Sequence, residues 1–284
     1  MSVYEDTMYI LKKYNINANK SLGQNFLIDE SVVSGIINSA NVSKDDLIIE
    51  IGPGLGTLTK DLLKKAKKVI AIELDDRMIK ILEDRFKSYD NFQLINDDVL
   101  KVDLKKLIEK EKSQNVKNVK IVANLPYYIT TPIIMKLLEE KLDIKSITVM
   151  IQKEVAERII ETPGGKMTGA ITYSVYYYAE SESNLLVPNT SFIPEPEVAS
   201  QVITLKIRPK PLLNDIDEKK LFKLIKVSFM QRRKTLVNAL SNSGLIEKNE
   251  IVRILNELNI DVRIRGEKLT IYDFAKISNK IVSC

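Results

Sequence analysis

Short apolar runs alternate with amphipathic stretches through the middle of the chain, beginning near residue 46. The runs are typical of buried strands, and they occupy residues 47–51, 68–73, 92–95, 119–123 and 147–151. Between them, apolar residues recur at helical spacing, which predicts helices over residues 57–65, 75–86 and 131–140. Alternating strands and helices with short connections indicate an α/β fold, in which helices cover both faces of an open, largely parallel sheet.

The pattern changes at a proline-rich boundary, Arg208-Pro209-Lys210-Pro211. Before it, an extended pair at 184–187 and 201–207 is expected to close the sheet. Beyond it, the spacing predicts helices over residues 217–230, 233–241, 248–258 and 271–280. We therefore expect two domains: residues 1–208, which open with a helical lead-in over 1–45, and a small all-helical domain over 209–284.

The composition is that of an ordinary globular protein, with 44% hydrophobic and 29% charged residues among 284. No apolar stretch is long enough to span a bilayer, and the N-terminus lacks the basic start and apolar core of a signal peptide. The only cysteine is Cys284, which excludes an intrachain disulfide. These features fit a cytoplasmic protein.

The chain contains no histidine, which removes imidazole as a catalytic base or metal ligand. A single cysteine likewise excludes a thiolate zinc site, and we predict no metal. The chemistry must therefore use carboxylates, amides, tyrosines, lysines or a cofactor.

The net charge of +5 is unevenly distributed. From Pro209 onward there are 15 Lys and Arg against 9 Asp and Glu, whereas the rest of the chain carries a net charge of −1. A basic appendage on a neutral body is typical of a nucleic-acid contact, although a solvated helical face explains the charge equally well.

A glycine-rich segment, residues 50–57, follows the first predicted strand and opens a helix. Glycines such as Gly52 and Gly54 let a backbone turn sharply and approach a ligand closely. The segment departs from G-x-G-x-x-G and carries a proline between its first two glycines, so it suits a nucleoside cofactor as well as a dinucleotide.

Acidic residues follow the next two strands. Glu73 ends the second strand, 21 residues after Gly52, where a carboxylate can accept hydrogen bonds from ribose hydroxyls. Asp98 follows the third strand, where it can accept one from an adenine amino group. Helix N-caps and exposed loop acids are the alternative explanation. Because the carboxyl ends of parallel strands meet at one edge, we favour a shared cofactor pocket.

The segment Asn124-Leu125-Pro126-Tyr127 follows the strand at 119–123 and suits methyl transfer to a planar amine. The amine lone pair is delocalised into the ring, and two acceptors on its N–H bonds would return that pair to nitrogen. The Asn124 side-chain oxygen and the Leu125 carbonyl are candidates. Pro126 stiffens the turn, and Tyr127 offers a face on which a base can stack. A strand-ending turn with partly buried tyrosines is the alternative. Together with a nucleoside pocket, the motif indicates S-adenosylmethionine.

These two motifs occur with further segments at residues 20–27 (KSLGQNFL), 152–156 (QKEVA), 191–196 (SFIPEP) and 229–236 (FMQRRKTL). With them, the chain resembles the small-subunit ribosomal RNA adenine N6-dimethyltransferase family over nearly its whole length. The resemblance implies the Rossmann-like sheet of class I S-adenosylmethionine-dependent methyltransferases. It also implies dimethylation of two adjacent adenosines in the 3′-terminal hairpin loop of small-subunit rRNA, linked to ribosome biogenesis.

The resemblance assigns roles to individual residues. It implies that the cofactor is bound by Gln24, Asn25, Leu27, Gly52, Gly54, Glu73, Asp98 and Asn124. It implies a catalytic site formed by Asn124, Leu125, Pro126, Tyr127 and Phe192. Phe192 would stack on the flipped adenine opposite Tyr127, although by itself it reads as a core side chain fixed by Pro194 and Pro196.

The partners implied are small-subunit rRNA and the small-subunit precursor, with no membrane, and we expect a monomer. The candidate RNA contacts are Lys153, Lys166, Arg232, Arg233 and Lys234. The last three open a predicted helix and would serve RNA contact or domain docking. Residues 161–167 resemble a mobile loop near the site.

Other functions are disfavoured by particular residues. A 23S rRNA adenine dimethyltransferase usually carries Ile at the position of Leu125 and has a different C-terminal domain. A DNA or protein methyltransferase more usually carries Pro there, and the loop and missing histidine disfavour an NAD-dependent dehydrogenase. A ribosome-assembly or transcription factor could use the same fold. Intact Asn124, Tyr127, Glu73 and Asp98 favour a working enzyme.

Overall fold

The structure is a computed structural model that describes residues 1–19, 23–112, 116–231 and 233–281. Its contacts divide the chain into two compact units. The first contains Met1–Ala156 and Ser181–Ile207, and the second contains Glu157–Glu180 and Arg208–Cys284. The second unit therefore includes a segment that lies before the proline-rich boundary. The functional division at residue 208 stays a prediction.

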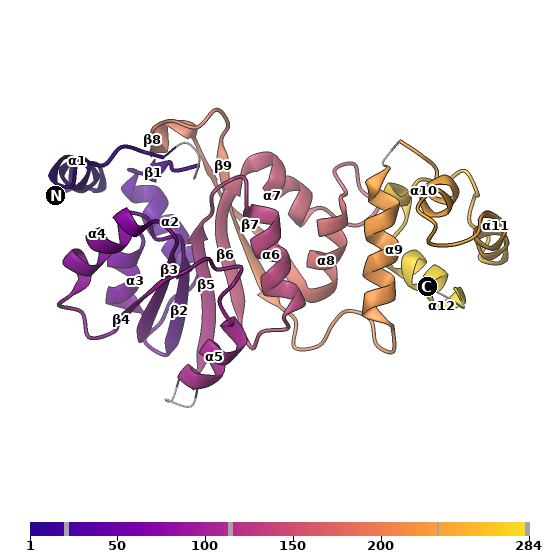
Figure 1. Cartoon of the computed structure of the whole chain (residues 1–284), viewed down its shortest axis with the longest axis horizontal. Helices are drawn as coiled ribbons and strands as arrows, with labels where there is room; N and C mark the ends of the chain where they lie inside the picture. Colours follow the sequence, from indigo (N-terminus) through magenta and orange to yellow (C-terminus); the bar gives the residue numbers. More distant parts are fainter. Residues whose placement is uncertain (20–22, 113–115, 232, 282–284) are drawn as a thin grey trace. The chain divides into compact units, whose positions relative to one another are not determined.

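A seven-stranded sheet forms the centre of the first unit, with strand order β4-β3-β2-β5-β6-β9-β7 (Figure 1). The strands are β2 (Asp46–Ile51), β3 (Lys68–Glu73), β4 (Phe92–Asn96), β5 (Asn118–Asn124), β6 (Ser146–Gln152), β7 (Ala179–Val187) and β9 (Ser200–Ile207). Strands β2 to β6 run parallel, and β9 runs antiparallel to β6. Two further strands, β1 (Phe26–Leu27) and β8 (Phe192–Ile193), pair separately. The α/β fold expected from the sequence is confirmed.

Helices cover the sheet of the first unit. They are α1 (Val3–Lys13), α2 (Glu30–Ser39), α3 (Thr59–Lys65), α4 (Asp76–Phe86), α5 (Leu104–Lys112) and α6 (Thr130–Glu139). Helix α7 (Lys153–Ile160) begins in the first unit and ends in the second. Helix α4 shows why they form: Asp75 caps its first turn by accepting from the Arg77 N–H, and Met78, Leu82 and Phe86 are buried on one stripe. No helix in the described ranges is long and apolar enough to cross a bilayer.

The central strands lie at the middle of the hydrophobic core. Every residue of β2 is buried, and so are most residues of β3, β5 and β6. Their sequences are mostly continuous apolar runs, interrupted by single polar residues such as Glu50 in β2 and Lys120 in β5, because helices exclude water from both faces of the sheet. The continuous runs are also the reason that the sequence predicted these strands to within one or two residues.

One buried ion pair lies at the amino ends of these strands, opposite the site described below. The Lys120 ammonium donates to Asp46 Oδ2 at 2.7 Å, and both side chains are buried. Asn118 and Ser43 also donate to the Asp46 carboxylate. Burial raises the pKa of Asp46, but the hydrogen bonds from Lys120, Asn118 and Ser43 outweigh burial and hold it below its usual range.

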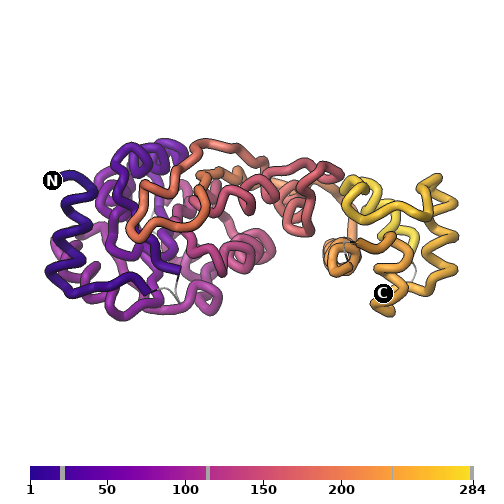
Figure 2. Tube along the Cα trace, turned by 90° about the horizontal axis from the view of Figure 1, so that it is seen from above, coloured from indigo at the N-terminus to yellow at the C-terminus, as the bar shows by residue number. Residues whose placement is uncertain are grey.

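The second unit is helical. Its helices are α8 (Ala170–Tyr178), α9 (Glu218–Met230), α10 (Leu236–Asn242), α11 (Lys248–Glu257) and α12 (Ile271–Lys280). The last four form the orange-to-yellow bundle in Figure 2. Tyr173 lies in its core, where its hydroxyl donates to the Leu269 carbonyl at 2.6 Å and its ring packs edge-on against Phe274.

The helix predicted over 233–241 begins only at Leu236, because the Thr235 side chain caps it by accepting from the Asn238 N–H. Arg233 and Lys234 therefore lie in the turn before the helix rather than opening it. Residues 161–167 do form a turn between helices, and Glu161 accepts hydrogen bonds from the Thr162 and Met167 N–H groups. The mobility of this turn stays a prediction.

The buried pair predicts a difference between two lysines that lie close in the sequence. Lys120→Met leaves a buried carboxylate without its cation and should lower the free energy of unfolding by about 3–5 kcal/mol. Lys117→Met removes an exposed pair with Asp45, at 3.0 Å, and should cost less than about 1 kcal/mol. Urea denaturation at neutral pH compares the two, and equal losses would contradict the role given to Lys120.

Candidate active site

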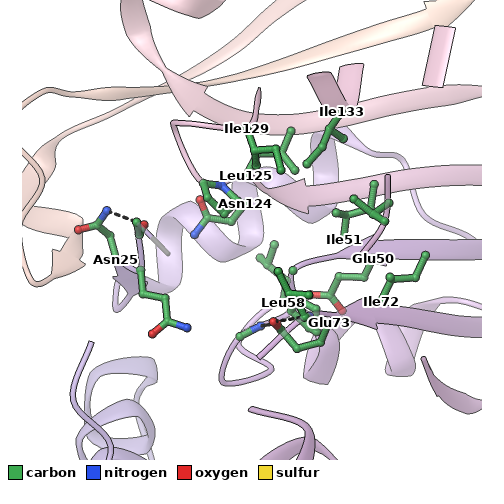
Figure 3. A pocket seen from close by; sticks show the side chains of 18 of the residues that line it. Asn25, Glu50, Ile51, Leu58, Ile72, Glu73, Asn124, Leu125, Ile129 and Ile133 are labelled. Atoms are coloured by element: carbon green, nitrogen blue, oxygen red, sulfur yellow. Dashed lines mark hydrogen bonds between the residues drawn. The ribbon is translucent and has the colours of Figure 1, made fainter. Parts of the chain in front are cut away.

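A cavity opens where the carboxyl ends of β2, β3 and β5 meet (Figure 3). The chain continues from β2 to its neighbour β3 on one side, and from β5 to its neighbour β6 on the other. The loops that leave β2 and β5 therefore run to opposite sides and leave a crevice between them. All residues predicted to bind the cofactor or to form the catalytic site line this cavity: Gln24, Asn25, Leu27, Gly52, Gly54, Glu73, Asp98, Asn124, Leu125, Pro126, Tyr127 and Phe192. The geometry brings them together, while their individual roles stay predictions.

The glycines after β2 have different surroundings. Gly52, Gly54 and Gly56 all have positive φ angles, of 66°, 57° and 82°. A Cβ on Gly52 or Gly54 would meet nothing within 4 Å, and both residues line the cavity. A Cβ on Gly56 would lie 2.5 Å from the Phe86 ring. The first two glycines thus leave space for a ligand, whereas Gly56 allows the loop to pack on α4.

Glu73 organises the edge of the cavity. Its carboxylate accepts hydrogen bonds from the N–H groups of Gly54 at 3.0 Å, Leu74 at 2.8 Å and Asp75 at 2.9 Å. Burial nevertheless raises the pKa of Glu73, because the cost of removing the charge from water exceeds the gain from these bonds. The carboxylate is fixed in place by the backbone, and it remains an acceptor for ligand hydroxyls.

Glu50 is a lining residue to which the sequence analysis gave no role. It lies on β2, is buried, and accepts a hydrogen bond from the Thr59 hydroxyl at 2.7 Å. Burial raises the pKa of Glu50, the Thr59 bond lowers it, and the neighbouring Glu73 charge raises it, so that the net pKa is about 8. The sequence could have indicated Glu50, because it is an acid inside an otherwise apolar strand segment, Leu47-Ile48-Ile49-Glu50-Ile51.

The Asn124 turn is held firmly by its neighbours. Asn124 is the last residue of β5, and the next residue, Leu125, is buried and donates its N–H to the Met150 carbonyl of β6 at 3.1 Å. The Thr130 hydroxyl donates to the Pro126 carbonyl at 3.1 Å. Across the ranges that the structure describes, no hydrogen bond engages the Asn124 side chain, so its amide is available to a ligand.

Two aromatic side chains line the cavity near this turn. Tyr127 is half-buried, and its hydroxyl lies 2.9 Å from Ser200 Oγ; burial raises its pKa, so the phenol stays neutral. Phe192 lies on β8 opposite Leu27 of β1 and is only 2% exposed. It belongs to the hydrophobic core and also lines the cavity, and its stacking on a target base stays a prediction.

The other predicted cofactor residues have partners of their own. The Gln24 amide donates to Asp75 Oδ2 at 2.8 Å and accepts from the Asn19 N–H at 2.9 Å, which ties the N-terminal segment to the end of β3. Asn25 donates to the Gly23 carbonyl at 3.2 Å (Figure 3). Asp98 accepts from the Leu100 N–H at 2.9 Å.

The predicted RNA contacts do not belong to the cavity lining. Lys153, Lys166, Arg233 and Lys234 are exposed, and none of them lines the cavity. Arg232 falls outside the described residues, as do residues 20–22 of the first family motif. Two exposed apolar residues to which no role was assigned from the sequence, Leu74 and Tyr128, also line the cavity and are 52% and 57% exposed.

The donor set fits a nucleoside cofactor. Two glycines leave room for it, a buried carboxylate stands where ribose hydroxyls would be received, and a side-chain amide without a partner among the described residues faces the same space. This is the arrangement that the sequence predicted for S-adenosylmethionine.

Comparisons with known proteins agree with this arrangement. The family model described as "Ribosomal RNA adenine dimethylase" matches residues 15–281. "Ribosomal RNA small subunit methyltransferase A" of Clostridioides difficile (strain 630) is 48% identical over 99% of this chain and 96% of its own length. The protein of the same name from Alkaliphilus oremlandii is 49% identical over 97% of this chain and 96% of its own.

Solved structures show the same fold. A dimethyladenosine transferase from Plasmodium falciparum superposes with a TM-score of 0.72 and 27% identity, covering 89% of this chain and 95% of that one. The 23S rRNA methyltransferase ErmE superposes with a TM-score of 0.66 and 22% identity, over 90% of this chain and 99% of that one. At that identity, the second match shows the fold alone.

The buried Glu50 predicts a specific dependence of stability on pH. The pKa of Glu50 rises from 4.5 to about 8 on folding. The stability that its neutral carboxyl group contributes is therefore fully present below pH 4.5, and it is lost as the pH rises through about 8. Glu50→Gln cannot ionise. Relative to wild type, the variant should therefore gain stability with rising pH, by up to about 1.4 kcal/mol per pH unit.

Urea denaturation of both proteins at about pH 5, pH 7 and pH 9 measures this difference. Glu83→Gln is the matched control. Glu83 is exposed on α4, so its replacement should leave the plot of unfolding free energy against pH parallel to that of wild type. Parallel curves for Glu50→Gln and wild type would contradict the raised pKa.

Proposed function

The chain belongs to the ribosomal RNA adenine dimethylase family, and from this premise we propose that it dimethylates adenine N6 in small-subunit ribosomal RNA. The observation that carries the proposal is the shared cavity. The Asn124 turn at the end of β5 lies in the same cavity as the glycine loop and Glu73, so an amine acceptor and a methyl donor can be bound next to each other.

The methyl donor is S-adenosylmethionine, which supplies a methyl group made electrophilic by its sulfonium. Glu73 would receive the ribose hydroxyls, because its carboxylate is already oriented by three backbone N–H groups. Gly52 and Gly54 would leave room for the cofactor beside the loop. Asp98, at the end of β4, would accept from the adenine amino group.

Asn124 and Leu125 would act on the target amine. The Asn124 amide oxygen and the Leu125 carbonyl each accept an N–H of the adenine amine, which favours a tetrahedral nitrogen with an available lone pair. The acceptors need a fixed geometry, and the Leu125–Met150 and Thr130–Pro126 hydrogen bonds supply it. The methylated amine then loses its proton to water, so the reaction needs no histidine.

Tyr127 and Phe192 would receive the target base. Aromatic faces bind any base by stacking, and two-sided stacking offsets part of the cost of flipping the base out of the RNA. The Tyr127 ring is held by its hydroxyl contact with Ser200, and Phe192 is held by the β1–β8 pairing. Both rings are therefore set in place before RNA binds.

The small ribosomal subunit is the better-supported substrate. The close relatives are named for small-subunit RNA, and Leu125 stands where large-subunit enzymes usually carry Ile. We further propose that the targets are two adjacent adenosines in the 3′-terminal hairpin loop. We also propose that the protein acts in the cytoplasm as a monomer, without a metal, on a small-subunit precursor.

The direct test is transfer of labelled methyl from S-adenosylmethionine to small subunits that lack the modification, followed by mapping of the labelled base. We expect N6-dimethyladenosine in the small-subunit 3′ hairpin. Large subunits and free DNA are the parallel substrates. Label in large-subunit RNA alone would assign the protein to the 23S rRNA adenine dimethyltransferases, and tight subunit binding without any label would indicate an assembly factor.

Asn124→Ala removes the proposed side-chain acceptor and should abolish methyl transfer, while the affinity for S-adenosylmethionine falls only moderately. Single-turnover transfer and equilibrium cofactor binding measure the two effects separately. Asn184→Ala, on the exposed strand β7, is the matched control and should behave as wild type. Near-normal transfer by Asn124→Ala would overturn the assignment of the turn.

Replacing Arg232, Arg233 and Lys234 together by Ala should weaken subunit binding and reduce the slope of log affinity against log salt by about 2–3. Lys101, Lys105 and Lys106, which are exposed on and next to α5, form a control of equal charge that should leave the slope unchanged. An unchanged slope for the first variant would assign those residues to packing within the second unit.

A further inference from the structure

The glycine-rich loop is held from outside the cavity by a residue of α4. The Arg85 guanidinium donates one hydrogen bond to the Leu55 carbonyl at 2.7 Å. Its other terminal nitrogen donates to the Asp6 carboxylate of α1 at 2.6 Å. The Arg85 and Asp6 side chains are only 14% and 24% exposed, so solvent and salt screen this ion pair weakly.

The same loop is also held from the cavity side, at the adjacent residue. Glu73 accepts a hydrogen bond from the Gly54 N–H at 3.0 Å, while Arg85 donates one to the Leu55 carbonyl. The Glu73 carboxylate therefore holds the Gly54 N–H, and the Arg85 guanidinium holds the carbonyl of the next residue, Leu55. With its carbonyl directed at Arg85, Leu55 places its buried side chain in the cavity lining.

The loop needs such support because of its sequence. Glycines with positive φ at positions 52, 54 and 56 give the loop many accessible conformations, and ordering them costs conformational entropy. Packing alone restrains only one of them, Gly56, which lies against Phe86. Arg85 precedes Phe86, so the two last residues of α4 restrain adjacent points of the loop.

We propose that Arg85, itself fixed by Asp6, is a positioning residue for S-adenosylmethionine. Arg85 does not line the cavity, and it acts by holding the Leu55 carbonyl so that the loop keeps its cofactor-binding conformation. Helix α1 thereby becomes part of the support of the cofactor site, although no α1 residue reaches the cavity. The inference rests on the cofactor of the proposed function and adds a residue and a helix to it.

The test measures the Kd of S-adenosylmethionine by calorimetry, without RNA, together with the KM of each substrate. Arg85→Met keeps the apolar stem and removes both hydrogen bonds, and it should raise the cofactor Kd about tenfold while kcat at saturating cofactor and the KM for RNA stay unchanged. Arg85→Lys should recover part of the affinity. Asp6→Asn should show a smaller loss, and the double variant should be no worse than Arg85→Met, because both act through one contact.

Lys13→Met is the matched control. Lys13 also ties α1 to α4, through Asp84 at 2.9 Å, and its loss removes the same charge, but it does not touch the loop. We expect an unchanged cofactor Kd for this variant, and thermal unfolding of each protein separates folding defects from binding defects.

An unchanged Kd in Arg85→Met, or an equal loss in Lys13→Met, would overturn the inference. The outcome is independent of the RNA assay. Wild type that binds S-adenosylmethionine without methylating small subunits would refute the proposed substrate and leave the role of Arg85 open to the same measurement. Wild type that fails to bind the cofactor would refute both.

Discussion

The parallel register of β3, β2 and β5 is the constraint on which the site depends. Because β2 pairs with both neighbours in parallel, the carboxyl ends of the three strands stop at one edge of the sheet. The glycine loop, Glu73 and the Asn124 turn are separated by tens of residues in the chain, and this register alone brings them into one cavity. The connections after β2 and β5 leave in opposite directions, which keeps the space between them open. The buried Lys120–Asp46 pair lies at the other end of the same strands and joins β5 to β2.

Within that cavity, carboxyl groups lie in a poorly solvated place. Glu73 is stabilised there by backbone N–H groups, whereas Glu50 has the single hydrogen bond from Thr59. The two acids therefore differ in chemistry: one is an oriented acceptor, and the other is predominantly neutral near pH 7 because burial raises its pKa to about 8. Placing one neutral acid beside a second acid avoids the repulsion of two close negative charges.

The chemistry proposed for the site would rely on geometry rather than on proton transfer. A chain without histidine has few groups that titrate near neutral pH, and the Asn124 turn presents an amide, a backbone carbonyl and an aromatic ring, none of which must change protonation. Such groups act only if they are fixed. Accordingly, the turn is tied to β6 through Leu125, its tyrosine to Ser200, and the glycine loop to both Glu73 and Arg85.

The sequence by itself determined the strands, the two main motifs and the family. Continuous apolar runs mark strands buried on both faces, and Gly52, Glu73 and Asn124 stand at strand ends, where position in the chain already indicates position in the sheet. The tertiary structure decided how these residues are surrounded. Gly54 borders open space while Gly56 packs on Phe86, although both are glycines of the same loop and nothing in the sequence distinguishes their surroundings.

The tertiary structure also decided the burial of Glu50, the contacts of Arg85 and the grouping of α8 with the C-terminal helices. A motif records which residue follows which, and it carries no information on partners that are distant in the chain. Desolvation, close packing and the Asp6–Arg85–Leu55 contact are properties of such distant partners, so only the folded chain could decide them.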